Sequence, residues 1–279
     1  MSIARPSVTD KRREFQRLHE SGCFLIPNPW DRGSALYLQS LGFRALATTS
    51  AGFAWSQGLP DNGVSREAML EHLAAMVAAT DIPVNADFEG GFATDSAGVA
   101  ESVRLGVGTG VAGLSIEDSS GDAERPLLDL ATAVDRIRAA RRAIDRSGGD
   151  TMLIGRSEGF IAGQPVLDET IHRLRAYANA GADCLYAPGL RTREQIAAVV
   201  ASVAPKPVNL LVGWVSDLDM AGIAALGVRR VSVGGALARS AWSGLVRAAK
   251  TLAEHGTFAG FADAASSGDL DRFFTQEKH

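Results

Sequence analysis

Oxygen-bearing side chains alternate along one short segment, PVNADFEGG, at Asn85, Asp87 and Glu89. Alternate positions on a β-strand lie on the same face, so these three groups would be neighbours. Carboxylates that are buried side by side need a positive partner, because an unpaired charge is costly to take out of water. The segment therefore predicts a cation at this place, with a solvent-facing side chain as the alternative for Glu89.

Two further charged residues end other short apolar runs of the chain, Glu117 in GLSIED and Arg156 in MLIGRS. Oxygen ligands without histidine or cysteine suit a hard divalent cation such as Mg²⁺, with Mn²⁺ as the alternative. We therefore expect Asp87, Glu117 and the nearby Asn85 to form a metal site. Arg156 presents a planar fork of donors that matches a substrate carboxylate. Each carboxylate taken alone could instead cap a helix or bind a loop.

Small and amide-bearing residues complete the expected pocket. In TTSAG, the residues Ser50, Ala51 and Gly52 leave room for backbone N–H groups to approach an anionic oxygen. Asn209, in PVNLLV, can bind the second oxygen of the carboxylate that Arg156 holds. Together these residues predict a pocket for a small 2-oxo acid or di-acid.

The same inventory disfavours several other chemistries. No lysine and no histidine ends any of the apolar runs, which argues against a Schiff-base lysine and against a zinc site with nitrogen ligands. The two cysteines, Cys23 and Cys184, lie at the beginning of their runs, away from the expected site. Two cysteines are also too few for a disulfide scaffold.

The candidate residues follow eight short β-prone runs, each separated from the next by a break and a helical stretch such as LATAVDRIRAARRAIDR. Alternating strands and helices predict parallel strands joined by crossover helices. Eight such units predict a (β/α)8 TIM barrel, whose active site lies at the C-terminal ends of the strands, with an open doubly wound sheet as the alternative. The runs cover residues 24–29, 45–50, 83–88, 113–118, 152–157, 184–189, 207–212 and 230–235.

Two segments extend the predicted barrel. We expect residues 3–21 to form an N-terminal helix that covers the bottom of the barrel. Residues 256–279 extend past the eighth helix as one or two short helices. The predicted organisation is thus a barrel domain of residues 1–255 and a C-terminal helical tail of residues 256–279.

The composition is that of an ordinary soluble chain. Its 279 residues carry 28 basic and 32 acidic side chains, a net charge of −4, which favours neither nucleic acid nor an anionic membrane. No apolar run approaches the roughly 20 residues that span a bilayer. The polar start of the sequence lacks the apolar region of a signal peptide. We expect a cytoplasmic protein with no nucleic-acid or membrane partner.

Several segments resemble, in order, motifs of the isocitrate lyase / phosphoenolpyruvate mutase superfamily, in particular its oxaloacetate decarboxylase / carboxyphosphonoenolpyruvate phosphonomutase-like branch. PNPWD, TTSAG, GLPDNG, GLSIED and PVNLLVG resemble family segments, NADFEGGF is similar to D-A-D-x-G-Y-G, and IGRSEG is similar to I-A-R-T-D-A. The resemblance covers nearly the whole chain. It implies a (β/α)8 barrel, Mg²⁺ binding, and cleavage or formation of C–C or C–P bonds next to a 2-oxo acid through an enolate.

Carried over by position, the resemblance implies a ligand set for the metal. Asp87 would hold the ion directly, while Asn85 and Glu117 would hold it through water. The family pattern begins with Asp where this chain has Asn85. That difference removes one negative charge from the expected metal site.

The resemblance also implies how the substrate is bound. Residues 50–52 would contact the oxo acid, Arg156 would help to fix it, and Asp61 in GLPDNG would lie on a mobile loop near it. The expected catalytic residues are thus Ser50, Asp61, Glu117 and Arg156. The family forms dimers or tetramers that exchange a C-terminal helix, so we expect a homodimer or homotetramer that exchanges the tail at 256–279.

The loop after residues 113–118 departs from the family. The lyase branch carries K-[KR]-C-G-H there, with its Cys as general acid, whereas this chain reads SSGDAERPL and lacks the mutase Lys and Asn as well. The predicted function is a Mg²⁺-dependent lyase that cleaves a C–C bond next to a small 2-oxo or 2-hydroxy di-acid, as in oxaloacetate decarboxylation, through a metal-stabilised enolate. The alternatives are a phosphonopyruvate-type C–P hydrolase or mutase, and a 2-oxo acid-binding protein with little turnover.

Overall fold

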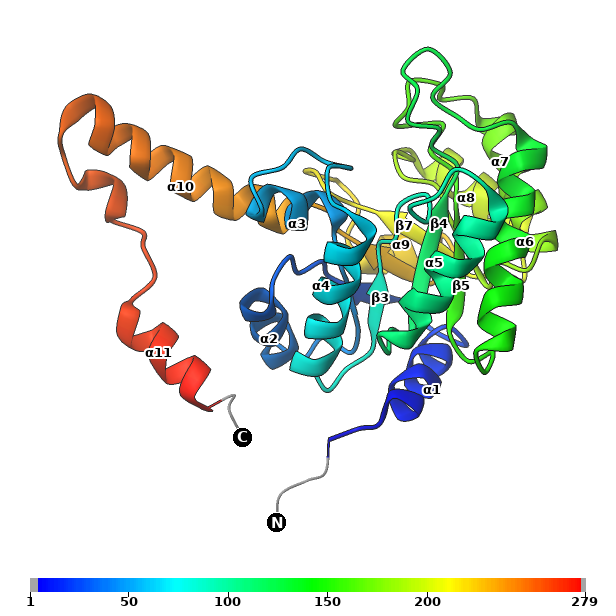
Figure 1. Cartoon of the computed structure of the whole chain (residues 1–279). Coiled ribbons are helices and arrows are strands. Elements are labelled where there is room, and N and C mark those ends of the chain that lie inside the picture. The colour runs from blue at the N-terminus through cyan, green and yellow to red at the C-terminus, as the bar shows by residue number, and fades with distance from the viewer. Residues whose placement is uncertain (1–4, 277–279) are drawn as a thin grey trace. The chain divides into compact units, whose positions relative to one another are not determined.

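The computed structural model describes residues 5–276, which divide into two compact units, the first ending at Gly235 and the second beginning at Ala236. Figure 1 labels the helices and strands along the chain. The first unit contains all eight strands of the single sheet. The strands are β1 (Phe24–Ile26), β2 (Leu46–Ala47), β3 (Val84–Ala86), β4 (Gly113–Glu117), β5 (Met152–Arg156), β6 (Cys184–Tyr186), β7 (Val208–Leu211) and β8 (Arg230–Ser232).

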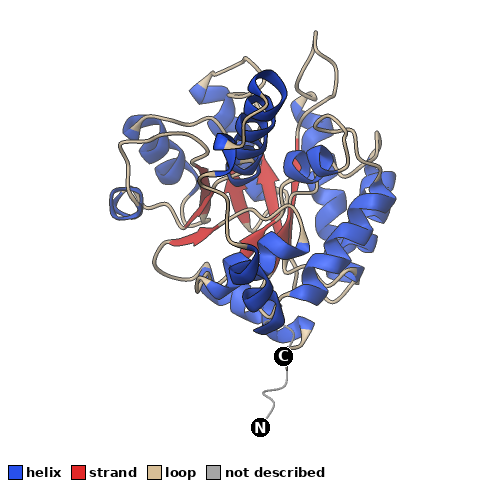
Figure 2. Ribbon diagram, turned by 90° about the vertical axis from the view of Figure 1, so that its left-hand side faces the viewer, coloured by secondary structure: helices blue, strands red, loops and turns tan. Residues whose placement is uncertain are grey.

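The eight strands are parallel and form a nearly closed barrel. Their order is β1-β8-β7-β6-β5-β4-β3-β2, so each strand pairs with its neighbour in the chain and β8 returns to β1. The gap between β1 and β2 is bridged by a backbone hydrogen bond from Ala47 N to Pro27 O of 3.0 Å. Figure 2 shows the strands at the centre with helices around them. The structure confirms the predicted (β/α)8 barrel.

Helices connect the strands and cover the outside of the barrel. Apolar spacing predicted one of them over residues 130–146, and the structure has α6 at those residues, with the Asp129 side chain accepting a hydrogen bond from Thr132 N at its start. No helix among the described residues combines the length and the apolar character needed to cross a bilayer. The helices between strands are α2 (Arg32–Ser40), α3 (Ser50–Ser56), α4 (Arg66–Ala79), α5 (Ser96–Gly108), α6 (Leu130–Arg146), α7 (Leu167–Asn179), α8 (Arg193–Val203) and α9 (Met220–Ala225).

An N-terminal helix, α1 (Val8–Leu18), closes the bottom of the barrel. Its residues Phe15 and Leu18 belong to a buried apolar cluster that includes Ala112, Met152 and Cys184, which lie at or just before the first residues of their strands. This packing confirms the helix predicted to cover that end. Residues 3 and 4 of the predicted segment lie outside the described residues.

The second unit contains α10 (Ala236–His255), the short helix η1 (Ala259–Phe261) and α11 (Ser267–Gln276). Gly260 of η1 passes so close to α10 that a Cβ at that position would lie 2.7 Å from the Cα of Ala248. The sequence prediction divided the chain after residue 255, whereas the compact units divide before α10. Exchange of the tail between subunits stays a prediction.

Gly113, at the start of β4, marks a position where the barrel interior has no room for a side chain. A Cβ there would lie 2.7 Å from Asn85 Oδ1 and 2.8 Å from Phe15 Cε1. Gly113→Ala should therefore displace α1 or β3 and lower the free energy of unfolding by about 1–3 kcal/mol. Urea unfolding followed by circular dichroism measures this change.

The matched control is Gly108→Ala at the end of α5, where an added Cβ meets nothing within 4 Å. This variant should be neutral or slightly more stable than the parent protein. Equal unfolding midpoints for the two variants would contradict the tight packing at Gly113.

Candidate active site

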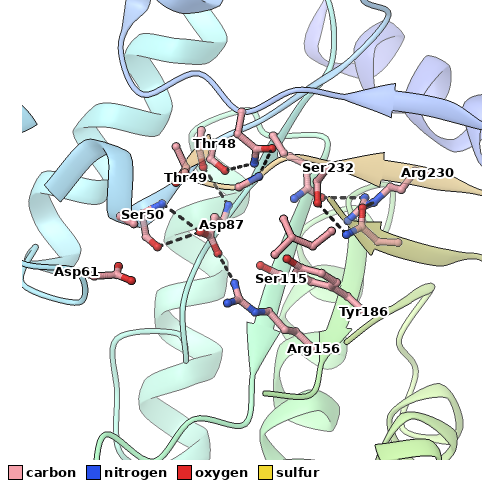
Figure 3. A pocket seen from close by; sticks show the side chains of 18 residues that line it. Thr48, Thr49, Ser50, Asp61, Asp87, Ser115, Arg156, Tyr186, Arg230 and Ser232 are labelled. Atoms are coloured by element: carbon pink, nitrogen blue, oxygen red, sulfur yellow. Dashed lines mark hydrogen bonds and ion pairs between the residues drawn. The ribbon is translucent and has the colours of Figure 1, made fainter. Parts of the chain in front are cut away.

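A cavity of about 170 Å³ lies among the C-terminal ends of the strands and reaches down inside the barrel (Figure 3). A neighbouring hollow shares part of its wall and adds Glu117. Gly52 lines neither of these two spaces. The residues of the cavity that were predicted from the sequence are Ser50, Ala51, Asp61, Asn85, Asp87, Arg156 and Asn209.

The register of the sheet explains why residues far apart in sequence meet here. Glu117 is paired with Arg156, Arg156 with Tyr186, Tyr186 with Asn209, and Asn209 with Arg230. Residues in register on neighbouring strands point to the same side of a sheet. The five side chains therefore form a continuous polar row across β4 to β8. We call these five residues the polar row.

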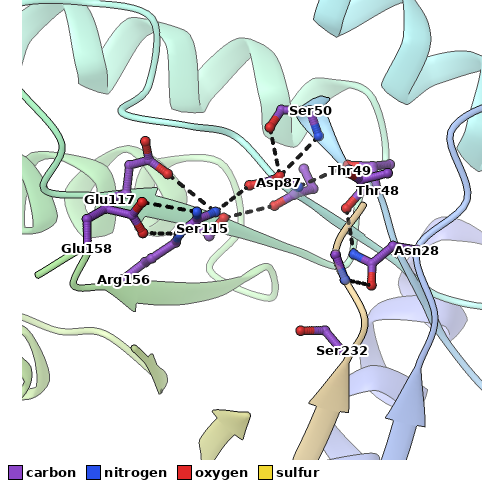
Figure 4. Close-up of polar contacts among 12 residues, drawn as sticks. Asn28, Thr48, Thr49, Ser50, Asp87, Ser115, Glu117, Arg156, Glu158 and Ser232 are labelled. Carbon is purple, nitrogen blue, oxygen red and sulfur yellow. Dashed lines mark hydrogen bonds and ion pairs between the residues drawn. The ribbon is translucent and has the colours of Figure 1, made fainter. Parts of the chain in front are cut away.

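Asp87 is held in place by four hydrogen bonds (Figure 4). Its Oδ2 accepts from the backbone N of Ser50 at 3.0 Å and from Ser50 Oγ at 2.9 Å. Its Oδ1 accepts from Arg156 Nη1 at 3.0 Å, and its own backbone N donates to Thr48 Oγ1 at 2.9 Å. The carboxylate is thus oriented by groups from β2, α3 and β5 before any ligand binds.

Arg156 joins three carboxylates at the mouth of the barrel. Besides Asp87, its guanidinium lies 3.3 Å from Glu117 Oε2 and donates to Glu158 Oε1 at 2.5 Å and Oε2 at 3.2 Å. The ring of Tyr186 lies beneath it, 5.1 Å from the guanidinium carbon to the ring centre. A single cation therefore faces more negative charge than it can neutralise.

Burial and the neighbouring charges change the pKa values of these acids. Burial raises the pKa of Glu117 well above its usual value; the Arg156 guanidinium opposes this rise, and the carboxylates of Glu158 and Asp87 add to it. Burial is also the main cause that raises the pKa of Glu158. These groups would release protons more readily if a further cation entered.

Glu89 lies inside the protein, only 9% exposed, and does not take the solvent-facing alternative. Its backbone adopts a left-handed conformation, with φ of 48°, which is uncommon for a residue other than glycine. Its Oε1 is buried without a hydrogen-bond partner. Burial first, and then the carboxylates of Asp87 and Asp61, raise the pKa of Glu89 to about 7.

Asp118 supports the site from behind, a role that the sequence reasoning missed. Its Oδ1 accepts from the backbone N of Glu158 at 2.7 Å, and its Oδ2 accepts from Tyr177 OH at 2.5 Å and from Arg173 Nη1 at 3.2 Å. Asp118 is only 1% exposed. The sequence offered one signal, the position of Asp118 directly after Glu117 in GLSIED. Its side-chain partners Tyr177 and Arg173 lie on α7 and could not be predicted.

Asn85 and Asn209 both lie in the cavity, and both turn toward Arg230 rather than Arg156. Asn209 Oδ1 accepts from Arg230 Nε at 2.8 Å, and its Nδ2 donates to Ser232 Oγ at 3.0 Å. Asn85 Oδ1 lies 3.4 Å from Arg230 Nη1. Arg230 was not predicted, because the sequence analysis took its candidates from the residues that end the apolar runs, and Arg230 begins its run.

The segment of residues 50–52 begins α3, and two of its backbone N–H groups already have partners. Ser50 N donates to Asp87, and Gly52 N donates to the side chain of Thr49, the residue that caps the helix. Ala51 lines the cavity. The contact of this segment with a 2-oxo acid stays a prediction.

The donor set fits a hard divalent cation in chemistry and in charge. Of the predicted ligands, Asp87 and Glu117 supply carboxylate oxygens, whereas the amide oxygen of Asn85 is turned toward Arg230. The buried Oε1 of Glu89, which has no hydrogen-bond partner, is a further acceptor at the site. Across the described residues, no three acidic, histidine or cysteine side chains converge as a ready-made metal site. Arg156 Nη1 lies between Asp87 and Glu117, in the place that a cation bound by both would take.

The comparisons with known proteins agree with the barrel and its site. Residues 15–253 match the family model described as Phosphoenolpyruvate phosphomutase. This match covers most of the chain, and the protein belongs to that family, within the PEP mutase/isocitrate lyase superfamily of lyases and mutases.

Sequence relatives include proteins of known and unknown activity. An uncharacterized protein of Mycobacterium tuberculosis is 33% identical over 222 residues, 79% of this chain and 81% of the relative. The oxaloacetate decarboxylase of Bradyrhizobium sp. (strain ORS 278) is 28% identical over 231 residues, 80% of this chain and 77% of the relative.

Two solved structures are similar over nearly the full length. One is a Burkholderia cenocepacia J2315 protein whose activity is given only as lyase/mutase; it is 45% identical, covers 96% of this chain and 98% of its own, and has a TM-score of 0.93. The other is an oxaloacetate acetylhydrolase in complex with the product oxalate, 26% identical over 99% of this chain and 96% of its own, with a TM-score of 0.86.

The raised pKa of Glu89 predicts a specific pH dependence of stability in metal-free protein. Folding raises this pKa from 4.5 to about 7, so the folded chain binds the proton more tightly than the unfolded chain. The contribution to stability is therefore complete below pH 4.5 and is lost as the pH rises to about 7. Relative to Glu89→Gln, the free energy of unfolding of the parent protein should fall by up to about 3 kcal/mol across this window.

Urea unfolding at pH 4.5, 5.5, 6.5 and 7.5 in the presence of a chelator measures the difference. Glu71→Gln, at an exposed position on α4, is the control and should leave the pH profile of the parent protein unchanged. A constant difference between the parent and Glu89→Gln over the whole range would show that Glu89 is ionised in the fold.

Proposed function

We propose that this protein is a Mg²⁺-dependent lyase that cleaves a C–C bond next to the 2-oxo or 2-hydroxy group of a small di-acid, with oxaloacetate as the first substrate. The observation that carries the proposal is the cluster in which Asp87, Glu117 and Glu158 surround Arg156 at the mouth of the barrel. The oxaloacetate decarboxylase and oxaloacetate acetylhydrolase among the similar proteins support the reaction class.

The size of the cavity supports a small substrate. The cavity, of about 170 Å³, has room for a four-carbon di-acid. The polar lining, with two arginines and five amide- or hydroxyl-bearing strand residues, suits an anion.

The proposed metal site uses Asp87, Asn85 and Glu117, with Mg²⁺ as the ion and Mn²⁺ as the alternative. A divalent cation bound there would draw electrons from the 2-oxo group and so favour the enolate that remains after bond cleavage. Asp87 is already oriented for this role by Ser50 and Arg156. Burial is the main cause that raises the pKa of four other acids in the site, and a bound cation would lower these pKa values.

Arg156 and Asp61 would control the oxo end of the substrate. Arg156 lines the cavity and donates to Asp87, so it lies next to the proposed metal ligand. Asp61 lines both the cavity and the neighbouring hollow. Partial burial and the Asp87 carboxylate raise the pKa of Asp61, which makes it a candidate proton donor to the enolate carbon.

Decarboxylation fits the residues better than cleavage of a 2-hydroxy acid. Loss of CO₂ from a 3-carboxylate breaks one C–C bond and leaves an enolate, and a single proton on carbon completes the reaction. Cleavage of a 2-hydroxy acid also needs a base for the hydroxyl proton, with a separate acid for the carbon. The loop that carries the acid Cys in the lyase branch reads SSGDAERPL here.

The two alternatives predict different products. A C–P hydrolase or mutase acting on phosphonopyruvate is supported by the family to which the chain belongs. A 2-oxo acid-binding protein with little turnover is supported by Asn85, which contributes no negative charge to the proposed metal site.

The test of the proposed lyase follows oxaloacetate, phosphonopyruvate and 2-methylisocitrate by NMR, with and without Mg²⁺. We expect metal-dependent formation of pyruvate from oxaloacetate, above the spontaneous rate measured with Mg²⁺ and no enzyme. Asp87→Ala should lower the rate at least about 100-fold, because it removes the oxygen that holds the cation. Asp135→Ala, an exposed acid on α6 paired only with Arg138, is the matched control and should keep full activity.

The outcomes separate the three readings. Phosphate or a rearranged phosphonate from phosphonopyruvate would favour the C–P alternative. No product from any of the three, together with protection against heating by pyruvate or 2-oxoglutarate, would replace the lyase with the binding protein.

A further inference from the structure

Arg230 lines the deep end of the cavity, where β8 begins, and is only 3% exposed (Figure 3). Its Nε donates to Asn209 Oδ1 at 2.8 Å, and its Nη1 lies 3.4 Å from both Asn85 Oδ1 and His19 Nε2. The ring of Phe15 lies 5.9 Å from the guanidinium carbon. All of these partners are amide, imidazole or aromatic groups.

The titratable neighbours of Arg230 carry no negative charge at neutral pH. Burial and the positive charge of Arg230 lower the pKa of His19 to about 3, so its imidazole is neutral. Burial raises the pKa of the Cys184 thiol and raises that of Tyr186 to about 12. Within residues 5–276, no carboxylate forms an ion pair with Arg230. A buried cation without an anion is costly, so the position calls for a negatively charged ligand.

Charge is therefore divided along the polar row. Arg156, at the mouth, faces the carboxylates of Asp87, Glu117 and Glu158. Arg230, at the floor, faces none. Between them, Tyr186 and Asn209 line the same cavity. A ligand that enters past the acids at the mouth would meet its strongest attraction at the floor.

We propose that Arg230, with Asn209 beside it, binds a carboxylate of the substrate at the floor of the cavity and so orients the 2-oxo acid. The arginine is then a specificity-determining residue for carboxylates against neutral carbonyl compounds. The inference takes the identity of the anion, a 2-oxo acid carboxylate, from the function proposed above. The position and the missing counter-charge of the guanidinium are independent of that function.

The chemistry of decarboxylation decides which carboxylate belongs at Arg230. A carboxylate that leaves as CO₂ loses its charge in the transition state, and a cation beside it would stabilise the substrate and slow the reaction. The carboxylate that remains on the product keeps its charge throughout. Arg230 should therefore hold the retained carboxylate, next to the 2-oxo group, while the departing one lies toward the acids at the mouth.

The test compares binding of pyruvate and of its neutral analogue pyruvamide by calorimetry, in a buffer without other small carboxylates. The parent protein should prefer pyruvate. Arg230→Met should weaken pyruvate binding about 10- to 100-fold, the effect expected for loss of a charged hydrogen-bond donor. Pyruvamide binding should change less than about twofold, and Arg230→Lys should keep part of the preference for the anion.

The matched control is Arg229→Met. Arg229 is the neighbouring residue, and its guanidinium donates to the carbonyl of Gly22 and does not line the cavity. This variant should retain the preference for pyruvate. Equal loss of both ligands in a folded Arg230→Met, or an unchanged preference for pyruvate, would show that Arg230 only packs between α1 and the barrel, and would overturn the inference.

Failure of the proposed function gives a different result. If no di-acid is turned over but pyruvate binding depends on Arg230, the inference stands and the lyase does not. If oxaloacetate is decarboxylated while Arg230→Met keeps the parent preference for pyruvate, the lyase stands and the inference does not.

Discussion

The contact between Arg156 and Asp87 is the interaction on which the rest of the site depends. It joins β5 to the end of β3, and the same guanidinium holds Glu117 from β4 and Glu158 from the following loop. Without this cation, several buried carboxylates would repel one another at the mouth of the barrel, at a cost that the surrounding hydrogen bonds could not offset. Burial nevertheless raises the pKa of Glu117 and Glu158, and the arginine opposes this rise only in part.

The barrel fixes this cluster from outside as well as from within. Asp118 ties the backbone of Glu158 to α7 through Tyr177 and Arg173, so the loop after β5 cannot move away from Arg156. On the other side, Ser50 fixes Asp87 from the first turn of α3. Catalytic geometry requires groups held within a fraction of an ångström, and such supporting contacts from neighbouring helices are the usual means.

Most of the fold and about half of the residues that line the candidate site could be predicted from the sequence, for different reasons. The eight strands followed from short apolar runs alternating with helical ones, and parallel strands necessarily bring Asp87, Glu117 and Arg156 to one end. Arg230 was not accessible, because its place depends on the register of β8 against β7, which pairs the first residue of β8 with Asn209 in the second position of β7. Register arises from the tilt of the strands in the closed barrel, which no local pattern encodes. Glu89 is buried, as the main expectation from the sequence had it, but its left-handed backbone takes it out of the strand alternation on which that expectation was based.

Asn85 lines the cavity, and its neutral amide affects the charge both at the proposed metal site and beside Arg230. An aspartate at this position, as in the resembling family motif, would lie against Arg230 Nη1, where the amide oxygen now lies at 3.4 Å. It would neutralise the guanidinium and occupy its remaining donors. The neutral amide satisfies the hydrogen bond without cancelling the charge, so the floor of the cavity stays positive. The charge missing from the proposed metal site and the cation without a counter-charge at the floor are therefore two consequences of one residue, and together they favour a ligand whose anionic end is buried deeper than its reacting carbonyl.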